Sequence, residues 1–343
     1  MKESKALLRI NGKLAFAILA TVALTFFAGF GMVALASWFM FATIDFLLAS
    51  IIGLVYAGIQ TLFQLILTPW SIQSHFGSKL KFITREDNPK VWDMVQEMSN
   101  EAKIKFSKVG ILNTSEINAF VYWGLGYGNA IVFTKGILNV LDEEELKGVC
   151  GHEIGHVRFG DVKAMIFLAS IPIFLHTFYY YSQSKESYEK DSLIWLLIFL
   201  IFFAALIASS FLSLYISRMR EYRADANSTQ MMKSPIPIAA ALAKITYKNV
   251  GKVKKTLATR KELHMLCIVD PNSVARQTKQ ISEKVKSIAE IADQIDDPDI
   301  DPDVLEKEME KEKLKGGELE RTHPLTVNRI TFVVEYSKEL GLI

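Results

Sequence analysis

Cysteine is scarce in this sequence: Cys150 and Cys267 are the only two in 343 residues. One possible pair is not a disulfide framework, which excludes the class of small secreted domains held together by several disulfides. We interpret both thiols as buried or unreactive groups in a reducing compartment. Runs of basic residues are also absent and the net charge is only +2, so the composition indicates no nucleic-acid partner.

Charged residues are missing from four long stretches of a chain that is 50% hydrophobic. No Asp, Glu, Lys or Arg occurs in residues 14–44, 46–78, 164–184 and 192–217. A helix needs about 20 apolar residues to cross a bilayer, and the first stretch is too long for the apolar region of a secretory signal peptide. We therefore predict a polytopic, mainly α-helical membrane protein with four transmembrane helices, at about 14–37, 46–68, 164–184 and 192–217.

Basic residues are concentrated on one side of these spans, and the connection within the second hairpin carries two lysines among three acids. Lys and Arg occur in the N-terminal tail, after the second span and after the fourth, whereas the connection within the first hairpin carries none. Because basic segments stay in the cytoplasm, we expect both termini and all soluble parts on the cytoplasmic side of the cell membrane. The predicted division is a tail and first hairpin at 1–75, a cytosolic part at 76–163, a second hairpin at 164–217 and a second cytosolic part at 218–343.

The cytosolic parts combine helices with short strands. Asn88 followed by Pro89 predicts the start of one helix, and Asp142 followed by three acidic residues predicts the start of another. Short apolar segments between glycine-rich turns predict strands at 109–112, 119–122 and 130–134. The expected fold of these parts is therefore α+β with a small β-sheet.

The segment VCGHEIGHVRFGD (149–161) places two histidines one helical turn apart. His152 and His156 share a helix face, so both imidazoles are able to bind one Zn²⁺. Glu153 follows the first histidine and lies close enough to take a proton from a water molecule without binding the metal itself, as a general base does. The alternative is a surface helix with a histidine pair that needs no metal.

A catalytic zinc needs a third protein ligand and an open position. The metzincin pattern fails, because Val162 and Phe159 occupy the positions where it requires a ligand and a glycine, and the charged DEEELKG before the motif argues against an intramembrane site. The segment REYRAD offers Glu221 as the ligand. Asp225, one turn later, would accept the outer N–H of a ligand histidine. Alternatively, Glu221 is only the partner of a nearby basic residue.

The second predicted hairpin explains the long gap between His156 and Glu221. Two spans return the chain to the side of the membrane that it left, so the two halves of one site would meet at the bilayer surface. His156 precedes the third span by about 12 Å of helix, and Glu221 follows the fourth by about 6 Å, at 1.5 Å per residue. The membrane pattern and the metal motif therefore support each other.

An ordered set of segments resembles the HtpX-type membrane metalloproteases of the gluzincin group. The set comprises two N-terminal spans, INAF (117–120), IVFTKGIL (131–138), DEEELKGVCGHEIGHVRFGD, two further spans, SRMREYRADANS and THPLTVNRI (322–330). The resemblance implies one zinc ion per chain and a cytosolic gluzincin-like protease domain formed by both cytosolic parts. It departs after His323-Pro324, where a second proline and a pair of acids are usual, and at Cys150-Gly151, where larger aliphatic residues and alanine are common.

The resemblance also assigns roles to residues outside the zinc motif. The strand at Asn118-Ala119 would be an edge that binds the substrate chain by β-augmentation, in which an extended backbone pairs without sequence demand. Asn118 is alternatively a turn residue. His323 would stabilise the developing oxyanion, or is simply a histidine at a helix start before proline.

The function implied is zinc-dependent endoproteolysis of damaged or misfolded membrane proteins, as part of quality control and the stress response. The expected partners are such polypeptides and the lipid bilayer. Two alternatives stay open. One is a processing peptidase for specific membrane or lipid-modified proteins, which the span count disfavours because that branch of the group has more spans. The other is a catalytically silent zinc scaffold, against which the intact Glu153 argues.

Overall fold

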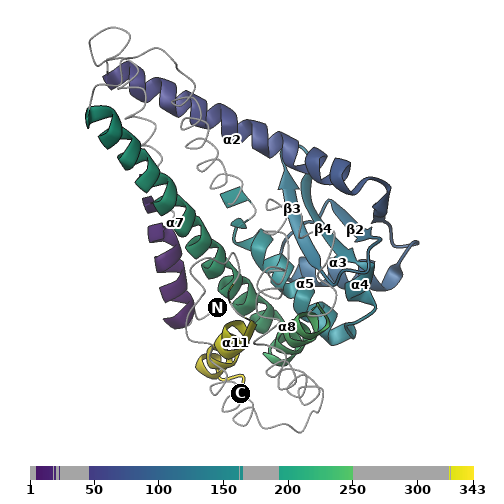
Figure 1. Ribbon diagram of the computed structural model, residues 1–343. Helices are drawn as coiled ribbons and strands as arrows, with labels where there is room; N and C mark the ends of the chain where they lie inside the picture. The colour runs from purple at the N-terminus through teal and green to yellow at the C-terminus, as the bar shows by residue number, and fades with distance from the viewer. Residues whose placement is uncertain are drawn as a thin grey trace.

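The computed structural model describes residues 5–17, 19–20, 23, 46–161, 163–164, 193–249, 324 and 326–343. A four-stranded sheet lies beside a group of helices, and two long helices extend away from them (Figure 1). The helices are α2 (Phe46–Phe76), η1 (Gly77–Lys79), α3 (Pro89–Glu101), α4 (Lys135–Leu138), α5 (Glu143–Arg158), α7 (Leu193–Met232), α8 (Ile236–Asn249) and α11 (Thr326–Leu340). The strands are β1 (Leu80–Ile83), β2 (Lys108–Leu112), β3 (Ala119–Gly124) and β4 (Gly128–Thr134).

The strand order across the sheet is β1-β2-β4-β3. The inner pair, β2 and β4, is parallel, and both outer pairs are antiparallel. The three predicted strands lie within β2, β3 and β4, and β3 is an edge. Strand β1 was not predicted, because this four-residue edge strand carries Lys81 between its apolar residues and shows no clear alternation.

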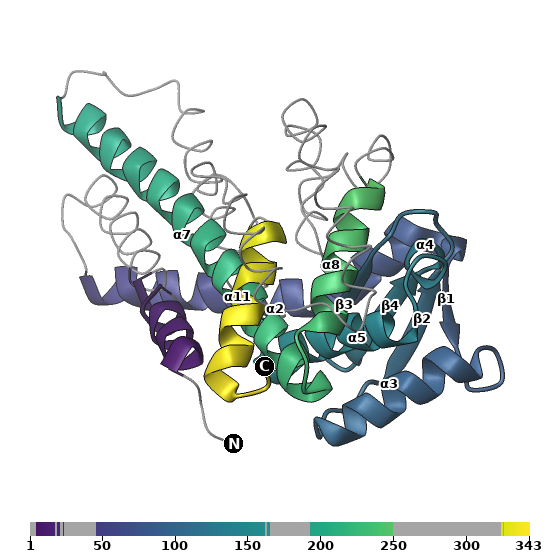
Figure 2. The ribbon, with the colours of Figure 1, turned by 90° about the horizontal axis from the view of Figure 1, so that it is seen from below.

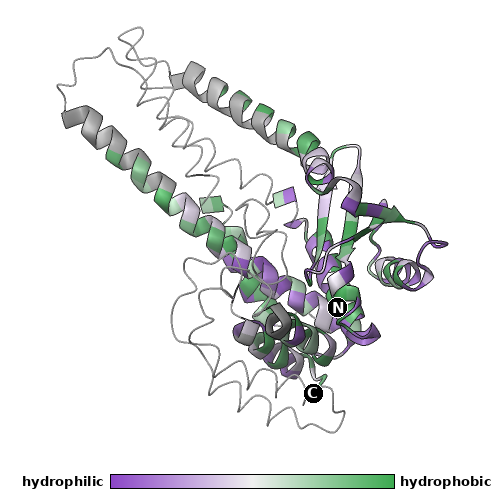
Figure 3. Ribbon diagram, turned by 45° about the vertical axis from the view of Figure 1, so that its right-hand side comes forward, coloured by the Kyte–Doolittle hydropathy of each residue, from purple (hydrophilic) through white to green (hydrophobic). Residues whose placement is uncertain are grey.

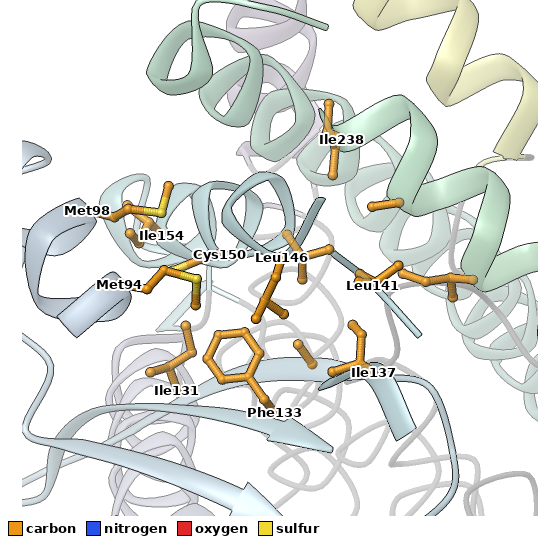
Figure 4. Packing of buried hydrophobic residues seen from close by; sticks show 14 of the residues in the cluster. Met94, Met98, Ile131, Phe133, Ile137, Leu141, Leu146, Cys150, Ile154 and Ile238 are labelled. Atoms are coloured by element: carbon orange, nitrogen blue, oxygen red, sulfur yellow. The ribbon is translucent and has the colours of Figure 1, made fainter. Parts of the chain in front are cut away.

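Strand β3 is buried on both faces of the sheet, and its successive side chains enter two different cores. Ala119 and Val121 belong to a core formed with residues of α3, α5 and α8, part of which Figure 4 shows. Phe120 and Tyr122 belong to a second cluster on the other face, which includes Ile72 of α2. The sheet is therefore held between the helix that carries the zinc motif and the end of α2.

Two predicted helix starts are confirmed. Asn88 Oδ1 accepts the N–H of Val91 at 3.1 Å, with proline at the first helical position. Asp142 and Glu145 form a capping box, in which each side chain accepts the backbone N–H of the other at 2.9 and 3.0 Å. Such a box satisfies two N–H groups that a helix start leaves without intrahelical partners, so the start of α5 is well defined.

A hydrogen bond links α2 to the segment after the edge strand β3, at the position of a proline in the helix. α2 continues through Pro69 to Phe76, eight residues beyond the predicted end of the second span at residue 68. Proline has no N–H, so the carbonyl of Leu65 loses its intrahelical donor. That carbonyl instead accepts the N–H of Leu125, directly after β3, at 3.1 Å. Gly124 permits the contact, because a β-carbon there would lie 2.0 Å from Cγ of Pro69.

The ligand segment REYRAD belongs to the same helix as the predicted fourth span. α7 is continuous from Leu193 to Met232, with its apolar part first and its polar part last. Its polar end packs between α5 and α11, and the N-terminal helical residues lie alongside (Figure 2). The backbone N–H of Ala6 donates to Glu339 of α11 at 3.1 Å, which ties the two chain ends together beside α7.

Apolar residues recur along the two long helices (Figure 3), and several of their large side chains are exposed. Those of α2 are Ile51, Val55, Ile59, Leu62, Phe63, Ile66 and Trp70, and those of α7 are Leu200, Phe203, Ile207 and Phe211. Within the described ranges, no helix is both long and apolar enough to qualify as a membrane span. The predicted spans at 14–37 and 164–184 lie mostly outside these ranges. The division into four spans and two cytosolic parts stays a prediction.

Candidate metal centre

Helix α5 buries the histidines and the glutamate of the zinc motif. His152, Glu153 and His156 are 1%, 3% and 7% exposed, so the alternative of a solvent-facing charged helix is wrong. The Nε2 atoms of the two histidines lie 3.1 Å apart. Burying two imidazoles and a carboxylate side by side costs free energy unless hydrogen bonds and opposite charges compensate for the lost solvation. The compensating groups come from other elements of the fold.

Helix α7 supplies the carboxylate that completes the group. One oxygen of Glu221 lies 3.6 Å from Nε2 of His152 and the other lies 3.6 Å from Nε2 of His156. One donor atom from each of these three residues fits within 4.8 Å of the others. The structure thus brings together the three side chains that the sequence predicted as ligands, from two helices separated by the second predicted hairpin.

Glycines let the two helices approach this closely. A β-carbon at Gly155 of α5 would lie 3.0 Å from Cα of Ala224 in α7. Side chains of α7 also donate to carbonyls that face them along α5: Ser228 Oγ to Gly148 at 2.6 Å, and Asn227 Nδ2 to Gly151 at 2.8 Å. The separation of α5 and α7 is therefore set by backbone contact rather than by large side chains.

A carboxylate holds the outer nitrogen of each histidine. Nδ1 of His152 lies 2.8 Å from Asp225 Oδ1, which is the arrangement predicted for Asp225. Nδ1 of His156 lies 3.0 Å from Asp161 Oδ2. A carboxylate only accepts hydrogen bonds, so Nδ1 of each ring carries a proton and Nε2 of each ring faces Glu221.

These donors fit a zinc ion. Two imidazole nitrogens and one carboxylate, converging from buried side chains, form the set that zinc prefers at sites with an open position. Burial alone would lower the pKa of His152, but its hydrogen bonds with Asp225 and Glu221 outweigh burial and raise this pKa to about 9. The space between the ligands therefore favours positive charge, which a divalent cation supplies to all three donors at once.

Glu153 is suited to hold a proton. Burial raises its pKa above the ordinary range of a glutamate, against the opposing effect of His152 and His156. A carboxylate with a raised pKa matches the requirement of a general base that works near neutral pH. The role of Glu153 as general base stays a prediction, with which this burial and raised pKa are compatible.

Asp161 was missed as a candidate functional residue, although it ends the quoted motif segment. Gly160 turns the chain after α5 with φ of +72°, a conformation that favours glycine, and Asp161 thereby reaches back to His156. Burial would raise the pKa of Asp161, but the hydrogen bond with His156 and the charges of Arg220 and Arg223 hold it below its ordinary range. The signal in the sequence was an acid placed just past the end of a ligand helix.

Arg329 of α11 was also missed. Its Nε and NH2 donate to Oδ2 and Oδ1 of Asp225 at 2.8 and 2.7 Å, and its NH1 lies 3.3 Å from Oε2 of Glu221. Burial would raise the pKa of Asp225, but the charge and hydrogen bonds of Arg329 keep it below its ordinary range. No local pattern in the sequence indicated that an arginine so far along the chain would enter the site.

The predicted edge residues have different roles in the sheet. Asn118 is engaged with β4: its N–H donates to Thr134 Oγ1 at 3.0 Å, and its carbonyl accepts the N–H of Thr134 at 3.0 Å. Because hydrogen-bonded and non-hydrogen-bonded pairs alternate, the backbone groups of Ala119 and Val121 point away from β4. His323, predicted near the zinc, lies outside the described residues.

Comparison with protein families agrees with this geometry. The model of peptidase family M48 matches residues 85–337, which include three of the four strands, the α5 motif, the ligand segment of α7 and most of α11. The chain belongs to peptidase family M48. The resemblance to HtpX-type proteases predicted from the sequence is confirmed, because curated relatives described as protease HtpX homologs match the chain at about 30% identity.

Three of these relatives illustrate the extent of the match. The protein from Methanothermobacter thermautotrophicus is 32% identical over 167 residues, covering 48% of this chain and 62% of the relative. The Bacteroides fragilis protein is 31% identical over 175 residues, covering 48% and 54%. The Streptococcus uberis protein is 32% identical over 213 residues, covering 58% and 69%. The chain thus spans between about half and two thirds of the length of these relatives.

A search of solved structures also gave a match. The crystal structure of S. mikatae Ste24p aligns with a TM-score of 0.45 and 18% identity, covering 95% of this chain and 64% of that one.

Proposed function

We propose that this protein is an integral-membrane, zinc-dependent endopeptidase. The observation that carries the proposal is the convergence of His152, His156 and Glu221, whose donor atoms lie within 4.8 Å of one another, beside the buried Glu153. These three residues would hold one zinc ion per chain, and Asp225 would orient His152. The two cytosolic parts, 76–163 and 218–343, would form one protease domain that faces the cytoplasm.

The side chains of the site would have separate roles in peptide hydrolysis. Bound zinc supplies Lewis acidity, which polarises the scissile carbonyl and acidifies water. Glu153 accepts the proton of the attacking water and returns it to the nitrogen of the leaving amine. Asp225 and Asp161 keep the two histidines in the tautomer that presents Nε2 to the site. His323 is proposed to approach the developing oxyanion.

The edge strand β3 would bind the substrate as an extended chain. Backbone groups of Ala119 and Val121 point away from β4, so they would pair with a substrate strand while Asn118 fixes the start of β3 through Thr134. The other end of this edge is taken by α2, whose Leu65 carbonyl accepts the N–H of Leu125. Pairing would therefore select an unfolded segment of limited length rather than a particular sequence.

The exposed apolar faces of α2 and α7 would lie against lipid. Ile51, Val55, Ile59 and Ile66 recur along one face of α2, at the spacing of successive helical turns. Contiguous apolar surface of this kind marks a membrane or partner interface. Four spans with the site at the bilayer surface would give access to damaged or misfolded membrane proteins, which are the proposed substrates.

The deciding experiment compares three proteins purified at full length in detergent with a chelator, then supplied with zinc. These are wild type, Glu153→Gln and the control Glu144→Gln, which makes the same chemical change at an exposed position of the same helix. We expect zinc to restore cleavage of casein and self-cleavage in wild type and in the control. Glu153→Gln should bind zinc equally but cleave about 10²–10⁴-fold more slowly, the range that a general base contributes.

Each other outcome has a definite meaning. Full activity of Glu153→Gln would exclude Glu153 as the base. Stoichiometric zinc binding by wild type without any cleavage would favour the catalytically silent scaffold. Cleavage of a peptide library at one sharp motif would favour the processing peptidase over a quality-control protease.

A further inference from the structure

Arg329 is the largest of the fully buried side chains in the described part of the chain, at 1% exposure. It enters the structure from α11, near the C-terminus, and α11 packs against α7 and α8. A buried guanidinium is costly unless opposite charges surround it. Its position therefore depends on which carboxylates it meets.

The guanidinium contacts both carboxylates that α7 directs into the site. Nε and NH2 form a fork on the two oxygens of Asp225, at 2.8 and 2.7 Å. NH1 lies 3.3 Å from Oε2 of Glu221. Asp225 Oδ1 accepts hydrogen bonds from Arg329 and from Nδ1 of His152. The planar guanidinium of Arg329 therefore contacts the predicted zinc ligand Glu221 directly, and it is linked to the predicted ligand His152 through Asp225.

The contact of Arg329 with Glu221 and Asp225 offsets the negative charge of these two buried carboxylates. Glu221 and Asp225 stand one turn apart on the same face of α7, and both are buried. Two carboxylates so placed repel each other and lose their solvation, so a neighbouring cation is needed to hold both side chains turned into the site. The positive charge of Arg329 offsets both effects: its NH1 forms an ion pair with Oε2 of Glu221, while Oε1 faces Nε2 of His156 at 3.6 Å.

Anchoring of α11 does not require this arginine. Ile330 and Val333 pack into the main core, and Phe332 contacts the ring of Tyr222 in α7 at 5.1 Å between centroids. Tyr336 is fully buried and forms a hydrogen bond with Gln230 of α7. For stability alone, an apolar side chain at position 329 with an apolar partner would serve at least as well as a buried ion pair.

We infer that Arg329 is a positioning residue of the metal centre, which makes the C-terminal helix part of the site. It acts through Asp225 and Glu221, by fixing the orientation in which α7 presents its carboxylates to the cation. The inference rests on the proposed zinc binding but adds a residue and a helix to it.

The test compares Arg329→Lys and Arg329→Met with the control Val333→Ala, in the full-length protein in detergent. Val333 lies on the same helix and is fully buried, but it packs in the apolar core, so its truncation weakens α11 without altering a charge near the site. For each protein we would measure the thermal midpoint, zinc affinity by competition with a chromophoric chelator, and the visible spectrum of the cobalt-substituted form.

We expect both Arg329 variants to bind zinc about 10–100-fold more weakly, as is typical when a group that orients metal ligands is removed. Their cobalt spectra should also differ from wild type, because the geometry of Glu221 changes. Val333→Ala should lose thermal stability but keep the wild-type affinity and spectrum. If Arg329→Met does not fold, combining it with Asp225→Asn removes both charges together. This double variant is compared with Asp225→Asn alone and should bind zinc more weakly than that single variant, because Glu221 then also loses its contact with Arg329; equal affinities would count against the inference.

Two results would overturn the inference in distinguishable ways. Arg329 variants that lose thermal stability but keep wild-type zinc affinity and cobalt spectrum would reduce the residue to a structural role, with the proposed function intact. Failure of the wild-type protein to bind zinc would overturn the proposed function itself, and the role of Arg329 with it.

Discussion

Gly155 of α5 lies directly against the backbone of Ala224 in α7, where an added β-carbon would be 3.0 Å from Cα. Ala224 stands between Glu221 and Asp225 on α7. The contact therefore sets how far these two carboxylates stand from His152 and His156. The missing side chain at Gly155 therefore helps to bring the two halves of the proposed site together.

Replacing Gly155 with alanine is expected to weaken zinc binding and lower stability. Overpacking a close contact costs about 1–3 kcal/mol, which exceeds the gain of up to about 1 kcal/mol in helix propensity. The thermal midpoint and the zinc affinity should both fall. Gly12→Ala is the matched control, because this helical glycine has nothing within 4 Å, and there the propensity gain should appear alone. A Gly155→Ala protein that matched wild type in both measurements would contradict this account.

Asp161→Asn should lower zinc affinity about as much as Asp225→Asn, each by about 10–100-fold. An amide at either position no longer requires the proton on Nδ1, so the histidine loses its preferred tautomer. The readout is competition with a chromophoric chelator. Asp93→Asn serves as the control, because Asp93 forms an exposed ion pair with Arg85, on a helix that carries none of the proposed ligands. Unchanged affinity in Asp161→Asn would show that its contact with His156 is incidental.

Zinc should raise the thermal midpoint of the wild-type protein and of Glu153→Gln by similar amounts. The increase for Glu221→Gln should be much smaller. A ligand that binds only the folded state adds about 2.7 kcal/mol of stability at 100 times its dissociation constant. Glu221→Gln keeps the shape of the ligand but loses its charge, so its zinc affinity and its stabilisation fall together. Equal shifts in all three proteins would place the zinc elsewhere.

Pro69→Ala should loosen the end of the edge strand. The substitution restores a backbone N–H at position 69, which would donate to Leu65 and draw that carbonyl back into the α2 ladder, so that Leu125 loses its acceptor. Hydrogen exchange of the segment 119–127 should then be faster. In Pro89→Ala, the same substitution falls at the first helical position of α3, where no intrahelical N–H is needed, and exchange in 119–127 should stay as in wild type.

Substrate peptides methylated at single backbone nitrogens should reveal pairing with β3. Outward backbone groups recur at every second residue of an edge strand, as at Ala119 and Val121, so affected and unaffected peptide positions should alternate. Binding to Glu153→Gln, measured by competition, separates this effect from the chemistry. Uniform tolerance of methylation along the peptide would exclude β-augmentation.

Local features of the fold were predictable because their causes lie within a few residues. Asn88 and Asp142 cap helices as expected, since a cap depends on the three residues that follow it. The strands β2, β3 and β4 were visible as apolar segments between turns. The continuation of α2 through Pro69 was not visible, because it depends on the hydrogen bond from the Leu125 N–H to the Leu65 carbonyl.

The sequence by itself determined the chemistry of the candidate site. The spacing of His152 and His156 places both on one helix face, and the spacing of Glu221 and Asp225 does the same on another helix. Only the tertiary structure decided how these faces meet. Glycines such as Gly155 allow the close approach, and their role depends on the residues of the other helix that pack against them. It also brought in Asp161, by a turn at Gly160, and Arg329, by docking of α11; contacts across such separations follow from packing, which no local pattern encodes.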